Sequence, residues 1–186
     1  IRVVNGNPDY SGITVAFGAR EIAGSNELKY GETIARDVKF GQVSNIGLFE
    51  PGLSPITLFA ATQPAQYITG VNINLEENKS YTLVLYKKED GSPAFTIIED
   101  NEENTNTKEI EEGVFVQVVN GVAGPSSVRI GIEPIISEST NQLFYGLNLA
   151  TVIPTGTTEI SVNGKKRTID LEKGKRLLIV ASGTTG

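Results

Sequence analysis

The sequence contains no cysteine, histidine, tryptophan or methionine. Without histidine or cysteine, a serine triad lacks its usual base and a thiol nucleophile is impossible, while zinc, copper and haem have no nitrogen or sulfur side-chain ligand. Only carboxylate, lysine, tyrosine and hydroxyl chemistry remains. We therefore expect a protein that is not an enzyme and that carries no cofactor.

Long apolar runs and an excess of positive charge are also absent. No apolar stretch approaches the roughly 18 residues of a membrane-spanning helix. The net charge of −6 and the pI of about 4.8 disfavour binding to a phosphate backbone, which depends on clustered Lys and Arg. We expect no membrane span and no nucleic-acid partner. The chain begins at Ile1 without an initiator methionine, which indicates either a processed, exported form or an incomplete sequence, and we favour processing.

An internal repeat is the strongest positive signal. Val3-Val4-Asn5-Gly6 recurs 115 positions later as Val118-Val119-Asn120-Gly121. Four further blocks match in the same order: residues 13–17 with 128–132, 40–41 with 145–146, 51–58 with 154–162, and 73–83 with 169–179. So many blocks in one order predict two copies of one module.

The matched blocks are short β-branched or alternating apolar and polar runs, bounded by turn residues, and this pattern is typical of strands. Asn163-Gly164 predicts a two-residue hairpin turn. Asn78 and Gly174 are expected to supply left-handed positions in equivalent turns. We predict an all-β chain of two tandem immunoglobulin-like β-sandwich domains at residues 1–100 and 114–186, joined by an acidic linker at 101–113.

The first copy resembles a known family. The residues that carry the resemblance are Arg2-Val3-Val4-Asn5-Gly6-Asn7-Pro8-Asp9, Phe40-Gly41, Pro51-Gly52 and Leu75-Glu76-Glu77-Asn78-Lys79-Ser80-Tyr81-Thr82-Leu83. They are similar to the domain-of-unknown-function family numbered 4397, over most of both copies. The second copy lacks the Pro-Asp element. The resemblance implies exported, cell-surface proteins with tandem sandwich domains of immunoglobulin or transthyretin type, and it brings no catalytic residue.

The two copies are unequal at their ends. The first continues from a strand at residues 81–86 into a closing strand near 94–99, whereas the second has no such continuation after its matching strand. An apolar edge strand exposes unpaired backbone groups and templates pairing with another chain. The expected assembly edge is Leu177, Leu178, Ile179, Val180 and Ala181. The candidate donor segments are Ile1, Arg2, Val3 and Val4, or Ala94, Phe95, Thr96, Ile97 and Ile98.

These features suggest an extracellular structural subunit of a filament or surface lattice, whose partners are copies of itself joined by β-strand complementation. The alternatives for the edge are a sheet that simply has one strand fewer and a chain that was cut short. The alternative function is a monomeric cell-surface adhesion module that binds carbohydrate or protein. An aromatic platform for such binding would use Tyr10, Tyr30, Phe49 and Tyr67.

The acidic linker offers one weak metal site. Asp100, Glu102, Asn104, Asn106 and Glu111 follow the spacing of an EF-hand calcium loop, but Thr105 stands where that loop needs glycine and no helices are predicted on either side. A solvated linker is the simpler interpretation. Asn5 and Asn120, which follow equivalent strands, are expected to bond to local backbone in a turn.

Overall fold

The computed structural model describes residues 1–21, 28–62, 66–88, 90–100, 113–123, 127–133, 142–144 and 148–184. Every regular element within these ranges is a β-strand, so the prediction of an all-β chain is confirmed. The chain divides into two compact units, the first formed by Ile1–Lys87 with Ser92–Asp100 and the second containing Asn101–Gly186.

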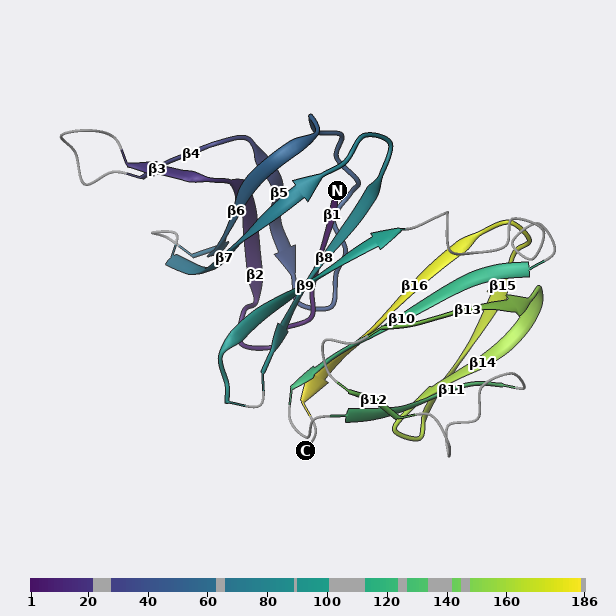
Figure 1. Ribbon diagram of the computed structural model, residues 1–186. Helices are drawn as coiled ribbons and strands as arrows, with labels where there is room; N and C mark the ends of the chain where they lie inside the picture. The colour runs from purple at the N-terminus through teal and green to yellow at the C-terminus, as the bar shows by residue number, and fades with distance from the viewer. Residues whose placement is uncertain are drawn as a thin grey trace. The chain divides into compact units, whose positions relative to one another are not determined.

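The first unit contains strands β1 to β9 (Figure 1). Their bounds are β1 Arg2–Asn5, β2 Gly12–Phe17, β3 Ala19–Glu21, β4 Leu28–Tyr30, β5 Thr33–Lys39, β6 Gly52–Ala60, β7 Gln66–Leu75, β8 Ser80–Lys87 and β9 Pro93–Asp100. They form a three-stranded sheet in the order β1-β8-β9, a four-stranded sheet in the order β5-β2-β6-β7, and a separate ribbon of β3 and β4.

The second unit contains strands β10 to β16. Their bounds are β10 Gly113–Ala123, β11 Ser127–Glu133, β12 Gln142–Phe144, β13 Asn148–Pro154, β14 Gly156–Val162, β15 Lys165–Leu171 and β16 Arg176–Thr184. The sheets have the orders β13-β10-β16 and β12-β11-β14-β15. Gly113, expected in the linker, is the first residue of β10.

Each unit is closed by a parallel pair between its first strand and a late strand. β1 pairs with β8 so that Val3 stands opposite Leu83, and β10 pairs with β16 so that Val118 stands opposite Ile179. Val3 and Val118 are equivalent in the sequence repeat, and so are Leu83 and Ile179. The repeat found in the sequence is therefore reproduced in the pairing register.

The other sheet repeats its register in the same way. β2 places Val15 opposite Leu58, and β11 places Ile130 opposite Val162. The next hairpins pair Gly52 with Leu75 and Gly156 with Leu171. These pairs are again equivalent residues of the two copies, so the two four-stranded sheets are built from matching strands in one order.

Residues 42–47 run along β1 where the second unit has β13 along β10. The Ser44 N–H donates to the Val3 carbonyl at 2.8 Å, and the Gly47 N–H donates to the Ile1 carbonyl at 2.8 Å. Val4 forms an antiparallel bridge with Val43. The free side of β1 is thus covered by an irregular counterpart of β13.

A separate apolar core lies between the two sheets of each unit. In the first unit, Val3 and Leu83 from one sheet join Ile13 and Leu58 from the other, all of them fully buried. In the second unit, Val118 and Val128 occupy the positions equivalent to Val3 and Ile13, and Ile130 is buried with them. Burial of alternate residues on facing sheets is the arrangement by which sandwich-like folds exclude water from a core.

The turns follow their predicted chemistry. Asn163 and Gly164 have φ values of 48° and 77°, as a type I′ hairpin requires. Asn78 and Gly174 occupy equivalent turns at φ 61° and 72°. The buried side chain of Asn5 accepts a hydrogen bond from the Asn7 N–H at 3.2 Å and donates to the Tyr10 carbonyl at 2.9 Å, which confirms its expected bonds to local backbone in a turn. It also donates to the carbonyl of Val38 in β5 at 3.1 Å.

Replacing a core residue of β6 will destabilise the first unit. Leu58 is fully buried and Leu53 on the same strand is 75% exposed. We expect Leu58→Ala to lower the free energy of unfolding by about 2–5 kcal/mol, and Leu53→Ala to change it by less than about 0.5 kcal/mol. Urea unfolding followed by tyrosine fluorescence will report this, because five of the six tyrosines belong to the first unit. Equal losses for both variants would contradict the assigned core.

Candidate functional site: the open edge of β16

β16 is the last strand of its sheet. It pairs with β10 on one side, and within the described part of the chain no strand pairs with its other side. In the first unit the equivalent strand, β8, lies between β1 and β9. β16 also extends to Thr184, three residues beyond the five predicted for the edge.

Backbone hydrogen bonds identify the groups that face outward from this edge. The Phe115 N–H donates to the Lys175 carbonyl at 3.2 Å, so the backbone of residue 175 points toward β10. Successive residues of a strand point their backbone groups to opposite edges. Leu177, Ile179 and Ala181 therefore bond toward β10, while Leu178 and Val180 direct their N–H and carbonyl groups outward.

The side chains leave this edge unprotected. Residues 177–181 carry no charge and no proline, which are the usual devices that prevent an edge from pairing with another chain. Leu177 and Ile179 pack against the core of the second unit, and Ala181 is buried within it. The edge strand β15 of the other sheet, by contrast, carries Lys165, Lys166 and Arg167.

The first unit shows what closes an edge of this kind. β9 pairs antiparallel with β8 from Ser80 opposite Asp100 to Lys87 opposite Pro93. Lys79 forms an ion pair with Glu99 of β9 at 2.9 Å. Lys175 is the equivalent of Lys79 in the repeat, it is exposed, and no described residue forms an ion pair with it. The second unit thus keeps the lysine without an acidic partner strand.

Both predicted donor segments are paired inside the first unit. Residues 1–4 include most of β1, and Val3 is fully buried there. Residues 94–98 form the middle of β9, where Ile98 is buried and Phe95 and Ile97 pack against the core. Neither segment is an unpaired arm. A donor that left its own sheet would lose the backbone bonds that it makes there.

The remaining predicted sites are not assembled by the described residues. Asp100 is the last residue of β9, and Glu102, Asn104, Asn106 and Glu111 lie outside the described residues. Within the described ranges there is no group of three or more acidic side chains placed to hold a metal ion. The calcium site stays a prediction.

The aromatic residues proposed as a platform lie in different settings. Phe49 packs edge-on against Phe17, with ring centroids 5.1 Å apart, and Tyr10 is half-buried against the same core. Tyr67 is 62% exposed and contacts Phe59. The side chain of Tyr30 lies outside the described residues. Tyr10 and Phe49 thus act in packing, which leaves Tyr67 exposed on β7.

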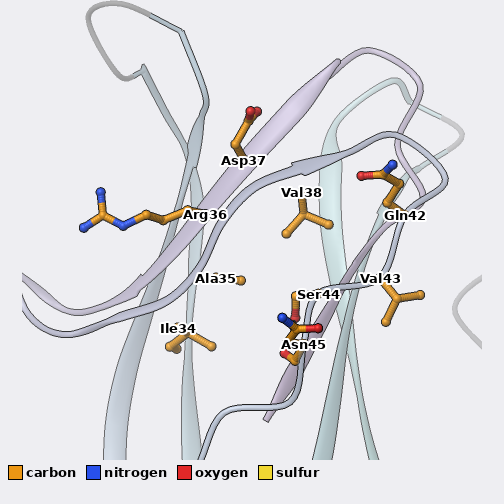
Figure 2. A pocket seen from close by; sticks show the side chains of 9 residues that line it. All are labelled: Ile34, Ala35, Arg36, Asp37, Val38, Gln42, Val43, Ser44 and Asn45. Atoms are coloured by element: carbon orange, nitrogen blue, oxygen red, sulfur yellow. The ribbon is translucent and has the colours of Figure 1, made fainter.

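The first unit has an open cleft that the sequence did not predict. It has a volume of about 320 Å³ and lies between β5 and the segment that runs along β1. Its lining residues are Ile34, Ala35, Arg36, Asp37, Val38, Gln42, Val43, Ser44 and Asn45 (Figure 2). Register shifts between β2 and β5, together with φ 48° at Asp37, kink β5 at this place. No sequence signal marks such a bulge.

A comparison with known protein families identifies the same family that the sequence resembles. Residues 1–131 match the family described as domain of unknown function DUF4397. The chain belongs to this family. The match covers the first unit and continues through β10 into β11, and it ends at Gly131 without the rest of the second unit. No curated protein matches the chain. The described residues contain no helix that is long and apolar enough to cross a membrane.

Hydrogen exchange will test the orientation of the β16 backbone. In dilute solution, the amides of Leu177 and Ile179 are expected to exchange at least about tenfold more slowly than those of Leu178 and Val180, because only the first pair bonds to β10. Residue-resolved exchange measured by NMR will show the alternation. Uniform protection along β16 in a monomer would mean that another segment of the chain covers this edge.

Proposed function

We propose that this protein is an extracellular structural subunit of a filament or surface assembly, which polymerises through β-strand complementation at β16. The single observation that carries this proposal is the open edge of β16 along the uncharged residues Leu177–Ala181, in the position that β9 covers in the first unit. Membership of the family supports export to the cell surface, because the resemblance described above implies exported, cell-surface proteins. We further propose that both units are immunoglobulin-like sandwiches, in tandem across residues 1–100 and 114–186.

The energetics favour addition of a strand at this edge. Each backbone hydrogen bond contributes about 1 kcal/mol net, and each large apolar side chain that is buried contributes about 1.5–3 kcal/mol. Ordering a flexible donor would cost about 1–2 kcal/mol per residue. A donor that is already a strand avoids most of that cost, so a preformed edge is the better partner.

The geometry of the contact determines the kind of assembly. β16 is an edge strand among the described residues of the second unit, whereas its counterpart β8 lies between β1 and β9 in the first unit. A donor from the first unit would therefore make a contact between two different surfaces. Contacts of this type repeat head-to-tail and form either closed rings or open filaments. The same chain would then supply donor and acceptor, and no second protein would be needed.

The cleft in the first unit favours a second candidate function, that of a monomeric adhesion module for a carbohydrate or a protein. Its rim carries Val43, which is 54% exposed, and Ile46 and Leu48 follow on the same connection at 58% and 94%. Exposed apolar side chains grouped in one segment often mark an interaction site. A glycan array and a panel of matrix proteins would test this function directly.

Removing one outward N–H from β16 will block polymerisation. Proline at residue 180 has no N–H to donate, and proline is tolerated on edge strands. We expect Val180→Pro to abolish the rise in light scattering with protein concentration. Val180→Thr keeps the N–H and the branched shape, so it is expected to assemble like the parent chain. Negative-stain microscopy will distinguish filaments from amorphous aggregates.

Two controls keep this test interpretable. Circular dichroism and urea unfolding will establish that each variant is folded, and Val180→Lys provides a second block that retains the N–H but introduces an edge charge. A parent chain that remains monomeric at all accessible concentrations would refute the assembly function. Filaments formed equally well by all of these variants would show that β16 is not the acceptor.

A further inference from the structure

We infer that the strand which completes the second unit is β9 of another copy of this chain, added antiparallel through its outer edge with Glu99 opposite Arg176. This inference rests on the proposed assembly at β16 and specifies its donor, direction and register.

The backbone orientation of β9 makes its outer edge available. The Gly6 N–H donates to the Leu85 carbonyl at 2.8 Å, so residue 85 of β8 bonds toward β1. By alternation, Val84 bonds toward β9, where it stands opposite Thr96. Thr96 therefore bonds toward β8, and its neighbours Phe95 and Ile97 direct their backbone groups away from the sheet. β9 is the last strand of that sheet within the described residues.

Matching outward residues on both strands restricts the register. On β9 the outward residues include Phe95, Ile97 and Glu99, and on β16 they include Arg176, Leu178 and Val180. When two edge strands pair in antiparallel fashion, each hydrogen-bonded pair must consist of one residue from each strand whose backbone groups point outward. If β9 paired with β16 in the register that it has with β8, Thr96 would stand opposite Val180. Thr96 bonds toward β8 and is not an outward residue, so this register fails the condition. It could arise only if β9 left its own sheet.

Charge selects one register among those that remain. Antiparallel pairing brings the acidic end of β9, Glu99-Asp100, to the basic beginning of β16, Lys175-Arg176. When Glu99 stands opposite Arg176, residue 100 stands opposite Lys175, so two pairs of opposite charge coincide. The three hydrogen-bonded pairs are then Glu99 with Arg176, Ile97 with Leu178, and Phe95 with Val180. A shift by two residues in one direction places Glu99 opposite Leu178 and loses both charge pairs. A shift in the other direction places Glu99 opposite Gly174 and leaves one charge pair, residue 100 with Lys173.

This register also avoids steric conflict between the copies. Ile97 faces the core of the first unit, whereas Leu178 lies on the face of β16 that is opposite to core-facing Leu177 and Ile179. Residues opposite each other in a ladder lie on one face of the sheet. The second sheets of the two joined units therefore lie on opposite faces of the continuous sheet, where they do not compete for space.

Disulfide trapping between copies tests the register, because the chain has no cysteine of its own. Glu99→Cys protein is mixed with Arg176→Cys protein under mild oxidation, and products are separated without reductant. Directly opposite residues have Cα atoms about 5.5 Å apart, which suits a disulfide. We expect a 99–176 disulfide between copies, and at least about tenfold less product when Lys173→Cys, which is also exposed, replaces Arg176→Cys.

Three results would overturn the inference. Products joined only through residue 176 of both copies would indicate symmetric pairing of β16 with β16. Trapping of Glu99→Cys by Leu177→Cys but not by Arg176→Cys would indicate that β9 leaves its own sheet. Filaments without any 99–176 product would leave the proposed function standing and remove this donor. A trapped dimer from a chain that never forms filaments would support the donor and refute the filament.

Charge reversal provides an independent readout. Glu99→Lys and Arg176→Glu each replace an attraction across the contact by a repulsion, and each is expected to raise the concentration at half-maximal scattering by about fivefold. Glu99→Lys also removes the ion pair with Lys79 inside the first unit, and Glu99→Gln, which removes that pair without adding a positive charge, is its matched control. The double variant restores opposite charges across the contact, so its midpoint should return to within about twofold of the parent value. Additive losses in the double variant would contradict the pairing of these two residues.

Discussion

The parallel pairing of the first strand of each unit with a strand near its end is the constraint on which the fold depends. β1 pairs with β8, and β10 pairs with β16, so strands from the beginning and from near the end of each unit lie side by side. This contact places the first residues of a unit in the middle of its core, where Val3 and Val118 are fully buried. Each remaining hairpin then packs its apolar face against the sheet that this pair has fixed.

Much of the fold could be predicted because the chain contains its own comparison. The matched blocks gave the equivalence of Val3 with Val118 and of Leu75 with Leu171, and both recur in the strand registers. Turn chemistry at Asn78 and Asn163 identified left-handed positions, because few other residues adopt them. Local signals of this kind depend on the residue itself and on its immediate neighbours.

Features set by long-range geometry could not be predicted. The ribbon of β3 and β4, the kink of β5 at Asp37 and the cleft beside it have no repeated or periodic signature. The comparison of the two copies led us to expect an open edge at β16, and among the described residues β16 pairs with β10 alone. The placement of both suggested donors within the first unit was not visible, because the parallel pairing of β1 joins residues about 80 positions apart.

The repeated register has a consequence for biosynthesis. The strands of the two units share one pairing register. In a chain that is only partly folded, β10 could therefore pair with β8, and β1 with β16. Synthesis from the N-terminus reduces this hazard, because all of β1 to β9 precede the first residue of β10. Sequence divergence adds a second barrier: Thr82, which accepts a hydrogen bond from Arg2 at 2.8 Å, is replaced by Leu178 in the later copy. The differences between the copies thus favour correct pairing within each copy.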